Sequence, residues 1–373
     1  MKVVTLFGTR PEIIRLSVVI RTLDRFCAQL LVHTGQNSDP QLSDVFFEDL
    51  GIRTPDEHLD VGPAGSFAAQ AAAIIERSGE VLQRERPDRV LILGDTTSGL
   101  AAIVAARSGI PVYHMEAGNR CYDDRVPEEI NRRVIDHSST VLMPYTARSK
   151  DNLIREGIER ERIFVTGNPI YEVLNLYQQQ IDASDVLDRL GVADRGYLLV
   201  TLHRAENVDD PARLARLCAA LAEAGREHSL PVLVSVHPRT TDRIGQFGVS
   251  AAGLTLLRPF GFFDFVKLEK RARAVLSDSG TVQEECAIFG VPNVTLRDVT
   301  ERAETVECGS NVLSGSYPGE ISRALRLALE MGSDWSPPPE YVVPHVSRTI
   351  AKIVLGYTSV RRHVSRLSVQ SEL

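Results

Sequence analysis

The chain has 373 residues, of which 43% are hydrophobic and 24% charged, and its formal net charge is −7. This composition is typical of a globular protein and excludes wholesale disorder, and the length predicts two or three domains. No apolar run approaches the roughly 20 residues that cross a bilayer, so we expect no membrane partner. The negative charge and the absence of a basic block argue against a nucleic-acid partner.

The N-terminal segment and the cysteines bear on the compartment. The opening apolar run is short and ends in Gly8-Thr9-Arg10, which favours a first β-strand over a signal peptide. The five cysteines are scattered without a CxxC pair, so the sequence indicates neither a zinc site nor a disulfide framework. We therefore expect a cytoplasmic protein that binds no metal.

In the first half of the chain, short apolar runs alternate with longer amphipathic runs. Strands are predicted at 2–8, 28–35, 88–95 and 110–118. Helices are predicted at 10–26, 41–50, 67–85 and 96–109. One face of the first helix is predicted to carry Ile13, Ile14, Val18, Leu23 and Phe26. Strands that alternate with helices predict a parallel sheet with helices on both faces.

The same alternation restarts after a polar helical stretch at 171–184. Strands are predicted at 195–203, 230–238, 254–259, 272–280 and 292–298, with a helix at 212–227. We therefore expect an α/β protein with two doubly wound domains and a cleft between them. The predicted boundaries are 1–170 for the first domain, 171–345 for the second, and 346–373 for a final helix and tail.

Ligands of open parallel sheets bind at the carboxyl ends of the strands, so the residues that follow each strand are candidates. In the first half, Arg10 stands at a helix start that suits a diphosphate, although a turn with a surface arginine fits equally well. Asp95, Glu116 and Glu128 follow the next strand ends. Each acid alone is explained by a helix cap, but three acids at strand ends favour acid/base chemistry.

The second half offers cations and hydroxyls at its strand ends. His203, His237, the Ser279-Gly280-Thr281 turn and Arg302 follow four predicted strands. One anionic ligand explains them better than four separate structural roles do. Phenylalanines at 260–265 could stack a base or simply fill the core. The residues themselves suggest a nucleotide held by the second half and acids offered by the first.

Eight short motifs stand in order between residues 7 and 302. They are FGTRPE (7–12), GDTT (94–97), EAG (116–118), PEEINR (127–132), TGNP (166–169), HRAEN (203–207), DSGTVQEE (278–285) and RDVTER (297–302). Together they resemble the non-hydrolysing UDP-N-acetylglucosamine 2-epimerase family. The resemblance implies two Rossmann-like domains of the type found in GT-B glycosyltransferases.

The resemblance also implies an isomerase that reversibly inverts C2 of a UDP-linked 2-acetamido sugar, UDP-GlcNAc to UDP-ManNAc. No cofactor is implied. UDP would leave from C1, the C2 proton would be removed to give a 2-acetamidoglucal, and UDP would add back after reprotonation. The family further implies a homodimer.

Residue by residue, the resemblance assigns roles to eleven positions, and the strand-end argument adds His237. Acid/base or catalytic roles fall on Asp95, Glu116, Glu128 and His203. Substrate-binding roles fall on Arg10, Arg15, His237, Phe265, Ser279, Gly280, Glu285 and Arg302. Among these, Glu285 falls on the ribose, Phe265 near the uracil, and Arg15 where the family usually has lysine.

Some motif variants leave the sugar and the reaction type open. The Glu-Ala-Gly-Asn-Arg-Cys segment at 116–121 and Thr281 resemble the branch that acts on UDP-N-acetyl-fucosamine-type sugars. The motifs are also compatible with a hydrolysing epimerase, a GT-B glycosyltransferase or a non-catalytic nucleotide-sugar sensor. The three acids favour an epimerase over a transferase, since a transferase needs at most one base.

Overall fold

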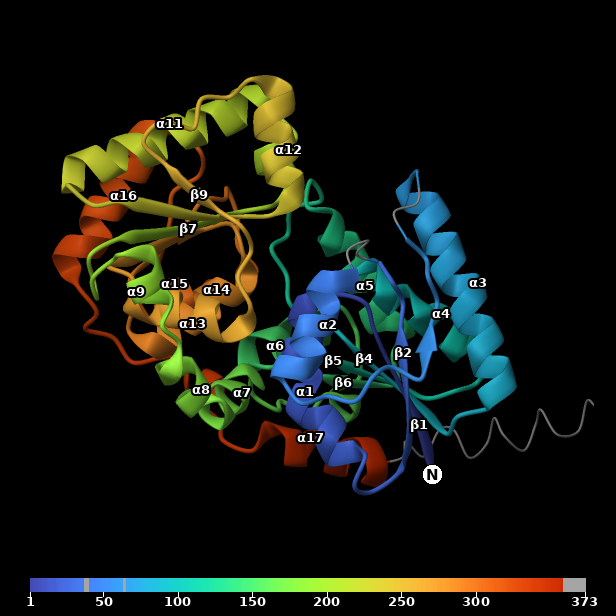
Figure 1. The fold of residues 1–373 in the computed structure, drawn as a ribbon. Helices are drawn as coiled ribbons and strands as arrows, with labels where there is room; N and C mark the ends of the chain where they lie inside the picture. The colour runs from blue at the N-terminus through green and yellow to red at the C-terminus, as the bar shows by residue number, and fades with distance from the viewer. Residues whose placement is uncertain (37–39, 63–64, 358–373) are drawn as a thin grey trace, which may run out of the picture. The chain divides into compact units, whose positions relative to one another are not determined.

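The computed structural model describes residues 1–36, 40–62 and 65–357, and these form two compact units. The first unit comprises Met1–Leu174 together with the segment that returns from Val343, and the second comprises Asn175–Val342. The expected tail, residues 358–373, lies outside the described residues. Each unit is an α/β layer structure (Figure 1).

The first unit is built on a parallel sheet with strand order β3-β2-β1-β4-β5-β6. Its strands are β1 (Lys2–Phe7), β2 (Ala28–His33), β3 (Glu57–His58), β4 (Arg89–Leu93), β5 (Val112–Met115) and β6 (Val141–Met143). Its helices are α1 (Arg10–Leu23), α2 (Pro40–Asp49), α3 (Phe67–Glu85), α4 (Ala101–Arg107), α5 (Pro127–Ser138), α6 (Ala147–Arg155), α7 (Ile170–Leu176) and α17 (Val346–Gly356). The 3₁₀ turns η1 (Thr97–Leu100) and η2 (Arg160–Arg162) complete it.

Both faces of the first sheet are covered by helices (Figure 1). Alternate residues of the strands, such as Val4, Ile92 and Val112, pack with α3, α4 and α5 in one buried cluster. The opposite face carries Tyr113, whose hydroxyl donates to the carbonyl of Tyr357 just after α17. α17 also packs on α1, so the last described helix completes the core of the first unit.

The second unit has the strand order β12-β11-β10-β7-β8-β9, again parallel. Its strands are β7 (Leu198–Leu202), β8 (Val232–Val236), β9 (Thr255–Leu257), β10 (Ala274–Ser277), β11 (Asn293–Thr295) and β12 (Asn311–Leu313). Its helices are α8 (Gln178–Ala183), α9 (Val186–Leu190), α10 (Ala205–Val208), α11 (Pro211–His228), α12 (Pro238–Phe247), α13 (Phe262–Arg271), α14 (Gly280–Phe289), α15 (Ala303–Glu307) and α16 (Pro318–Met331), with the 3₁₀ turn η3 (Pro339–Tyr341). One face packs on α11 and α16, and the other on α13 and α14.

The predicted α/β class with two doubly wound sheets is confirmed. The prediction for Phe26 is wrong: α1 ends at Leu23, and Phe26 lies beyond it with 66% of its surface exposed. The helix predicted from residue 96 begins as the 3₁₀ turn η1 before α4. Strands β3, β6 and β12 were not predicted, because each has only two or three residues and shows no readable alternation.

Both sheets share the strand order of dinucleotide-binding Rossmann folds, in which the chain reverses direction across the sheet beside the first strand. The first sheet reverses between β1 and β4, and the second between β7 and β10. The carboxyl ends of these neighbouring strands are where such folds bind ligands. In each unit, the candidate residues therefore lie in the turns that follow these two strands, and in the first unit also in the turn after β5.

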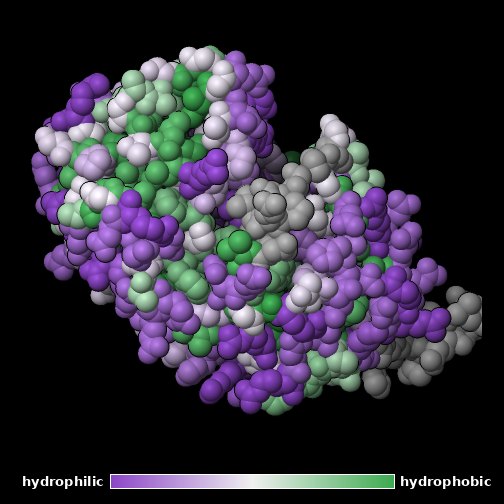
Figure 2. Space-filling view, in the orientation of Figure 1, coloured by the Kyte–Doolittle hydropathy of each residue, from purple (hydrophilic) through white to green (hydrophobic). Residues whose placement is uncertain are grey.

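Hydrophilic residues predominate on the surface seen in Figure 2, and apolar residues on this face gather over the second unit. Among the described residues, no helix is both long and apolar enough to cross a membrane.

Candidate active site

Glu12 joins the turns that follow β1 and β4. It is 2% exposed on α1, and its Oε2 accepts hydrogen bonds from the Gly8 and Thr9 amides at 2.8 and 2.7 Å. The Thr9 and Thr96 hydroxyls donate to it at 2.9 and 2.8 Å. Burial raises the pKa of Glu12 to about 7, although the hydrogen bonds it accepts oppose the rise. A single carboxyl thus fixes the two turns on either side of the reversal point.

Asp95, the predicted acid after β4, is held by a buried arginine from α5. The Arg132 Nε donates to Asp95 Oδ2 at 2.7 Å, and Arg132 Nη1 donates to Glu129 at 2.7 Å. The Asp95 side chain keeps 29% of its surface exposed, whereas those of Arg132 and Glu129 are almost completely buried. Burial acts to raise the pKa of Glu129, but hydrogen bonds from the Cys121 amide and Arg132 outweigh it and lower the pKa. Asp95 is the accessible member of this group.

Glu116 follows β5 in a left-handed backbone conformation, with φ of +63°. Its Oε2 lies 3.2 Å from Arg15 Nη1 and accepts a weak 3.4 Å bond from the Tyr145 hydroxyl. Asn119 Nδ2 donates to the other carboxylate oxygen at 3.3 Å. A Cβ atom built on Gly94 would lie only 3.7 Å from Glu116 Oε2, so this carboxylate lies beside the residue that precedes Asp95. The structure therefore brings Asp95, Glu116 and Arg15 together.

Glu128 and Arg10 lie at the N-termini of two helices of the first unit. Glu128 is half-buried in the first turn of α5, on which Arg132 also lies. Arg10 begins α1, and its guanidinium carbon lies 5.9 Å from the centre of the Phe46 ring.

In the second unit, Asp278 performs the role that Glu12 performs in the first. Its buried carboxylate follows β10 and accepts the amides of His203 and Arg204, both at 3.0 Å, from the turn after β7. The His203 Nδ1 lies 3.0 Å from Asp278 Oδ1, and 42% of the His203 side chain is exposed. Burial acts to raise the pKa of Asp278, but His203 and these hydrogen bonds hold it well below its usual range. The aspartate thus fixes an exposed imidazole at the reversal point.

The N-terminus of α14 gathers several charged groups. A Cβ atom at Gly280 would lie 2.7 Å from Glu301 Oε1 and 3.6 Å from the Arg302 guanidinium. Arg297 is 1% exposed and donates to Glu301 Oε2 at 2.8 Å. The Nε and Nη2 groups of Arg297 form no hydrogen bond among the described residues. Backbone amides and guanidinium groups at one helix N-terminus can bind an anion.

Glu285, Phe265 and His237 lie on three helices around the same sheet. Glu285 on α14 is 6% exposed and lies next to the buried Glu269 of α13. Burial, with a further contribution from Glu285, raises the pKa of Glu269 well above its usual value. Phe265 is half-buried against the α13 and α14 side of the core. His237 caps α12, where its Nδ1 accepts the Arg239 amide at 3.2 Å.

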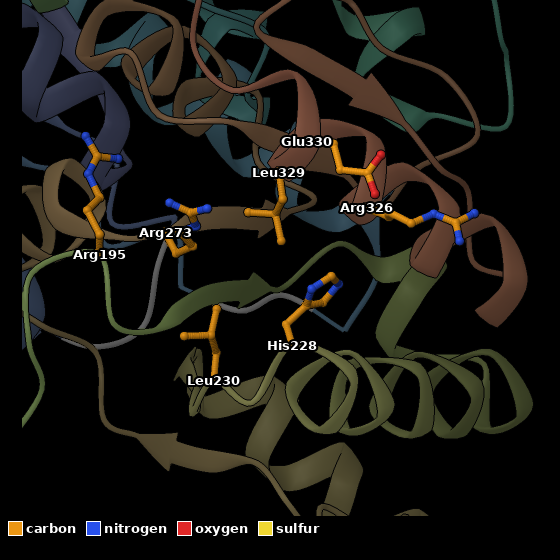
Figure 3. A pocket seen from close by; sticks show the side chains of 7 residues that line it. All are labelled: Arg195, His228, Leu230, Arg273, Arg326, Leu329 and Glu330. Atoms are coloured by element: carbon orange, nitrogen blue, oxygen red, sulfur yellow. The ribbon is translucent and has the colours of Figure 1, made fainter.

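A separate hollow in the second unit does not coincide with these residues. Its volume is about 370 Å³, and it lies near the C-terminal ends of α11 and α16 and before the starts of β7 and β10. Figure 3 shows Arg195, His228, Arg273 and Arg326 around it. This is the amino-terminal edge of the sheet, away from the strand ends that carry the candidate site. Throughout the described part of the chain, no group of three or more His, Cys, Asp or Glu could hold a metal ion.

Three residues of the site were not predicted as site residues. Glu12 could have been found, because Thr9 and Glu12 have the spacing of a capping box, and the structure contains one. Asp278 begins the DSGTVQEE motif, but its contacts with the turn after β7 depend on the sheet order. Arg132 ends the PEEINR motif, and its bond to Asp95 depends on how α5 packs on the sheet.

Comparison with known proteins gives a consistent result. The sequence family described as UDP-N-acetylglucosamine 2-epimerase matches residues 22–355. The UDP-N-acetylglucosamine 2-epimerase of Methanocaldococcus jannaschii is 39% identical over 91% of this chain and 95% of its own. Its crystal structure with UDP-GlcNAc and UDP superimposes with a TM-score of 0.90 at 37% identity, covering 95% of this chain and 99% of that one.

Two further matches bear on the sugar and on the fold. A UDP-2,3-diacetamido-2,3-dideoxy-D-glucuronate 2-epimerase of Pseudomonas aeruginosa is 38% identical over 88% of this chain and 92% of its own. The glycosyltransferase WaaG has the same fold at 15% identity, with a TM-score of 0.60 over 96% of this chain and all of that one.

Proposed function

Because the chain belongs to the UDP-N-acetylglucosamine 2-epimerase family, we propose that it interconverts UDP-GlcNAc and UDP-ManNAc by inverting C2. The observation that carries this proposal is the pair of carboxylates after β4 and β5. Asp95 is held by Arg132, and Glu116 is held by Arg15 and Asn119. A reaction that removes a proton from one face of a ring and returns one to the other face needs two positioned acid/base groups.

The proposed reaction begins with loss of UDP. The C1–O bond breaks with its electron pair leaving on UDP, and a carboxylate takes the C2 proton as the C1–C2 double bond forms. A second acid then protonates the opposite face of C2, and UDP adds back to C1. Asp95, Glu116 and Glu128 are the proposed acid/base groups, with Arg15 beside Glu116 as a stabilising charge.

The second unit is proposed to bind UDP. His203, Arg302 and the α14 N-terminus at Ser279 and Gly280 would stabilise the charge on the departing diphosphate. The buried Arg297 adds N–H groups that form no hydrogen bond within the described residues. Arg10, at the N-terminus of α1, is proposed to contact the diphosphate as well.

Three further residues have proposed roles in UDP binding. Glu285 would accept hydrogen bonds from the ribose hydroxyls, Phe265 would contact the uracil, and His237 would line the nucleotide site.

A second candidate substrate is a UDP-2-acetamido sugar with a modified ring, of the fucosamine or diacetamido-glucuronate type. The Pseudomonas aeruginosa relative acts on a sugar of that kind, and the motif variants at 116–121 point the same way. A panel of these UDP-sugars, compared by kcat/KM, decides between the candidates.

We also propose that the protein is a cytoplasmic homodimer. All five cysteines are free, as is usual in a reducing compartment. Analytical ultracentrifugation tests the dimer, and cell fractionation tests the location.

The decisive experiment is NMR of UDP-GlcNAc with the enzyme in D₂O. We expect UDP-ManNAc to appear with deuterium at C2 and with little free UDP. Accumulation of free sugar would indicate a hydrolysing enzyme, and an unchanged substrate would contradict the proposal. Asp95→Asn, Glu116→Gln and Glu128→Gln should each lower kcat by about 10²–10⁴ while leaving UDP affinity unchanged.

Two further variants complete this experiment. His203→Ala should weaken UDP binding measured by calorimetry, because it removes an imidazole proposed to face the diphosphate. Asp124→Asn is the matched control, since Asp124 is an exposed carboxylate near the start of α5 that pairs with Arg133. Near-normal turnover in all three acid variants would refute the assignment of the acids.

A further inference from the structure

Three buried ionisable residues lie beneath the turns that carry Asp95 and Glu116, and the proposed reaction uses none of them. His114 is on β5, Asp136 is on α5, and Arg120 follows the turn after β5. Their exposed fractions are 1%, 0% and 5%. Burying charged groups is costly unless each finds a partner, so such a cluster calls for a physical explanation.

The three side chains form one hydrogen-bonded chain. The His114 Nδ1 lies 2.9 Å from Asp136 Oδ1, and the other Asp136 oxygen lies 2.8 Å from Arg120 Nη2. Arg120 continues to Glu156, to which its Nε donates at 2.7 Å. Burial acts to raise the pKa of Asp136, but His114 and Arg120 outweigh it and lower the pKa. Asp136 is therefore an ionised acceptor.

The far nitrogen of the imidazole reaches the backbone next to Asp95. His114 Nε2 lies 2.8 Å from the carbonyl oxygen of Gly94. A carbonyl oxygen can only accept, so Nε2 carries a proton; an ionised Asp136 can also only accept, so Nδ1 carries one too. His114 thus donates from both ring nitrogens, and its position is fixed at both ends.

The same cluster holds both acid-bearing turns. Gly94 has φ of +76°, and its amide donates to the Met115 carbonyl at 3.0 Å, which ties the β4 turn to β5. The Gly118 amide donates to Asp136 at 3.2 Å, which ties the turn that contains Glu116 to α5. His114 and Asp136 therefore link the backbone on which Asp95 stands to the backbone on which Glu116 stands.

We propose that His114, held by Asp136, is a positioning residue that sets the orientation of Asp95 relative to Glu116 through the Gly94 carbonyl. The inference rests on the proposed function, because it assigns these two acids to the reaction. A displacement of a reacting group by about 1 Å can cost about 10²-fold in rate, so a tether at the neighbouring peptide has a measurable effect.

Two substitutions separate the two ends of the imidazole. The amide nitrogen of glutamine reaches about as far as Nε2, so His114→Gln keeps a donor for the Gly94 carbonyl. The amide of asparagine is shorter and reaches only as far as Nδ1, so His114→Asn keeps the bond to Asp136 and loses the one to Gly94. We expect His114→Asn to lower kcat about 10²-fold and His114→Gln less than tenfold, with KM and UDP affinity unchanged in both.

The control is His137→Asn, at an exposed histidine on the same helix as Asp136, which should retain wild-type kcat. Equal losses in the two His114 variants, or a greater loss in His114→Gln, would overturn the positioning role. A rise in KM that matches the fall in kcat/KM would overturn it as well.

A second measurement does not depend on turnover, and its main result comes from the wild-type protein. ¹⁵N-histidine NMR of the wild-type protein should show a slowly exchanging imidazole with protons on both ring nitrogens, and Asp136→Asn should remove one of these protons. A neutral His114 in the wild type would contradict the inference. If the wild type does not convert UDP-sugars, the proposed function fails, and the NMR result still decides whether His114 holds the Gly94 carbonyl.

Discussion

At the residue scale, Glu12 shows how a buried carboxyl can be structural and still titrate near neutrality. It accepts hydrogen bonds from Gly8, Thr9 and Thr96 with almost no contact with water. Because burial raises its pKa to about 7, the neutral form is favoured in the folded state over the range in which an unfolded glutamate is already ionised. Its contribution to stability must therefore depend on pH.

The sign of this dependence follows from the two pKa values. Glu12 is neutral in both states below about pH 4.5, so its contribution is complete there and is lost as pH rises through about 7. The free energy of unfolding should fall by an amount on the order of 3 kcal/mol over this range. Glu12→Gln cannot ionise at this position, so its stability should not show this fall. Urea unfolding between pH 4.5 and 8 should show the stability of the wild type falling relative to that of the variant. Glu80→Gln, at an exposed position of α3, is the control. If the free energy of unfolding of the wild type and that of Glu12→Gln differ by the same amount at every pH, the prediction is wrong.

The residue types of the candidate site could be predicted from sequence, but most of their partners could not. Asp95 and Glu116 are identifiable because each follows an apolar strand. Their pairing with Arg132 and Arg15 depends on where α5 and α1 lie on the sheet, which no local pattern contains. The twelve assigned roles remain predictions, since contacts alone do not establish a catalytic role.

At the element scale, the turn between β5 and α5 is tightly packed around Gly118. This residue has φ of +80°, and a Cβ atom built there would lie 2.3 Å from the Ser149 carbonyl oxygen of α6. A backbone oxygen cannot move aside as a flexible side chain can. Gly109, after α4, has a similar φ of +69° but no heavy atom within 4 Å of the corresponding position.

These two glycines make a matched pair. Gly109→Ala should lower the free energy of unfolding by about 1–2 kcal/mol, because alanine is strained in a left-handed backbone conformation. Gly118→Ala should lower the free energy of unfolding by about 1–3 kcal/mol more, because the added methyl group enters a packed site. It should also lower kcat, because the turn carries Glu116. Denaturant midpoints and turnover of both variants test this. Equal losses of stability in the two variants would show that the turn accommodates the methyl group, contrary to the prediction.

Long elements of both sheets could be predicted, and short ones could not. The predicted bounds of α3 agree with the structure at both ends, because the helix has 19 residues and an amphipathic pattern throughout. β3 has two residues, and β6 and β12 have three each, so they form where the sheet offers them a partner strand. Their existence is a tertiary effect that sequence periodicity does not record.

At the scale of the whole molecule, the order of strands and motifs was enough to predict the fold class and the family. Two runs of alternating strands and helices predict two doubly wound sheets, and the comparisons confirm the family. The place of α17 was not predictable in this way. It follows the second unit in sequence but packs on α1, where Ile350 and Val354 are fully buried. An amphipathic pattern predicts that one face of a helix is buried, but it does not predict which unit buries that face.

Because α17 belongs to the first unit, a substitution that weakens its packing should destabilise that unit. Ile350→Ala should lower the free energy of unfolding by about 2–5 kcal/mol, the usual effect of truncating a fully buried branched side chain. We expect hydrogen exchange to accelerate in β1 and β4, whose unit α17 completes, while β7 and β10 keep their protection and UDP affinity stays unchanged. Lys352→Ala, at an exposed position of the same helix, should leave exchange unaltered throughout. A uniform loss of protection in both units would mean that they unfold as one cooperative structure, and that α17 supports the second unit as much as the first.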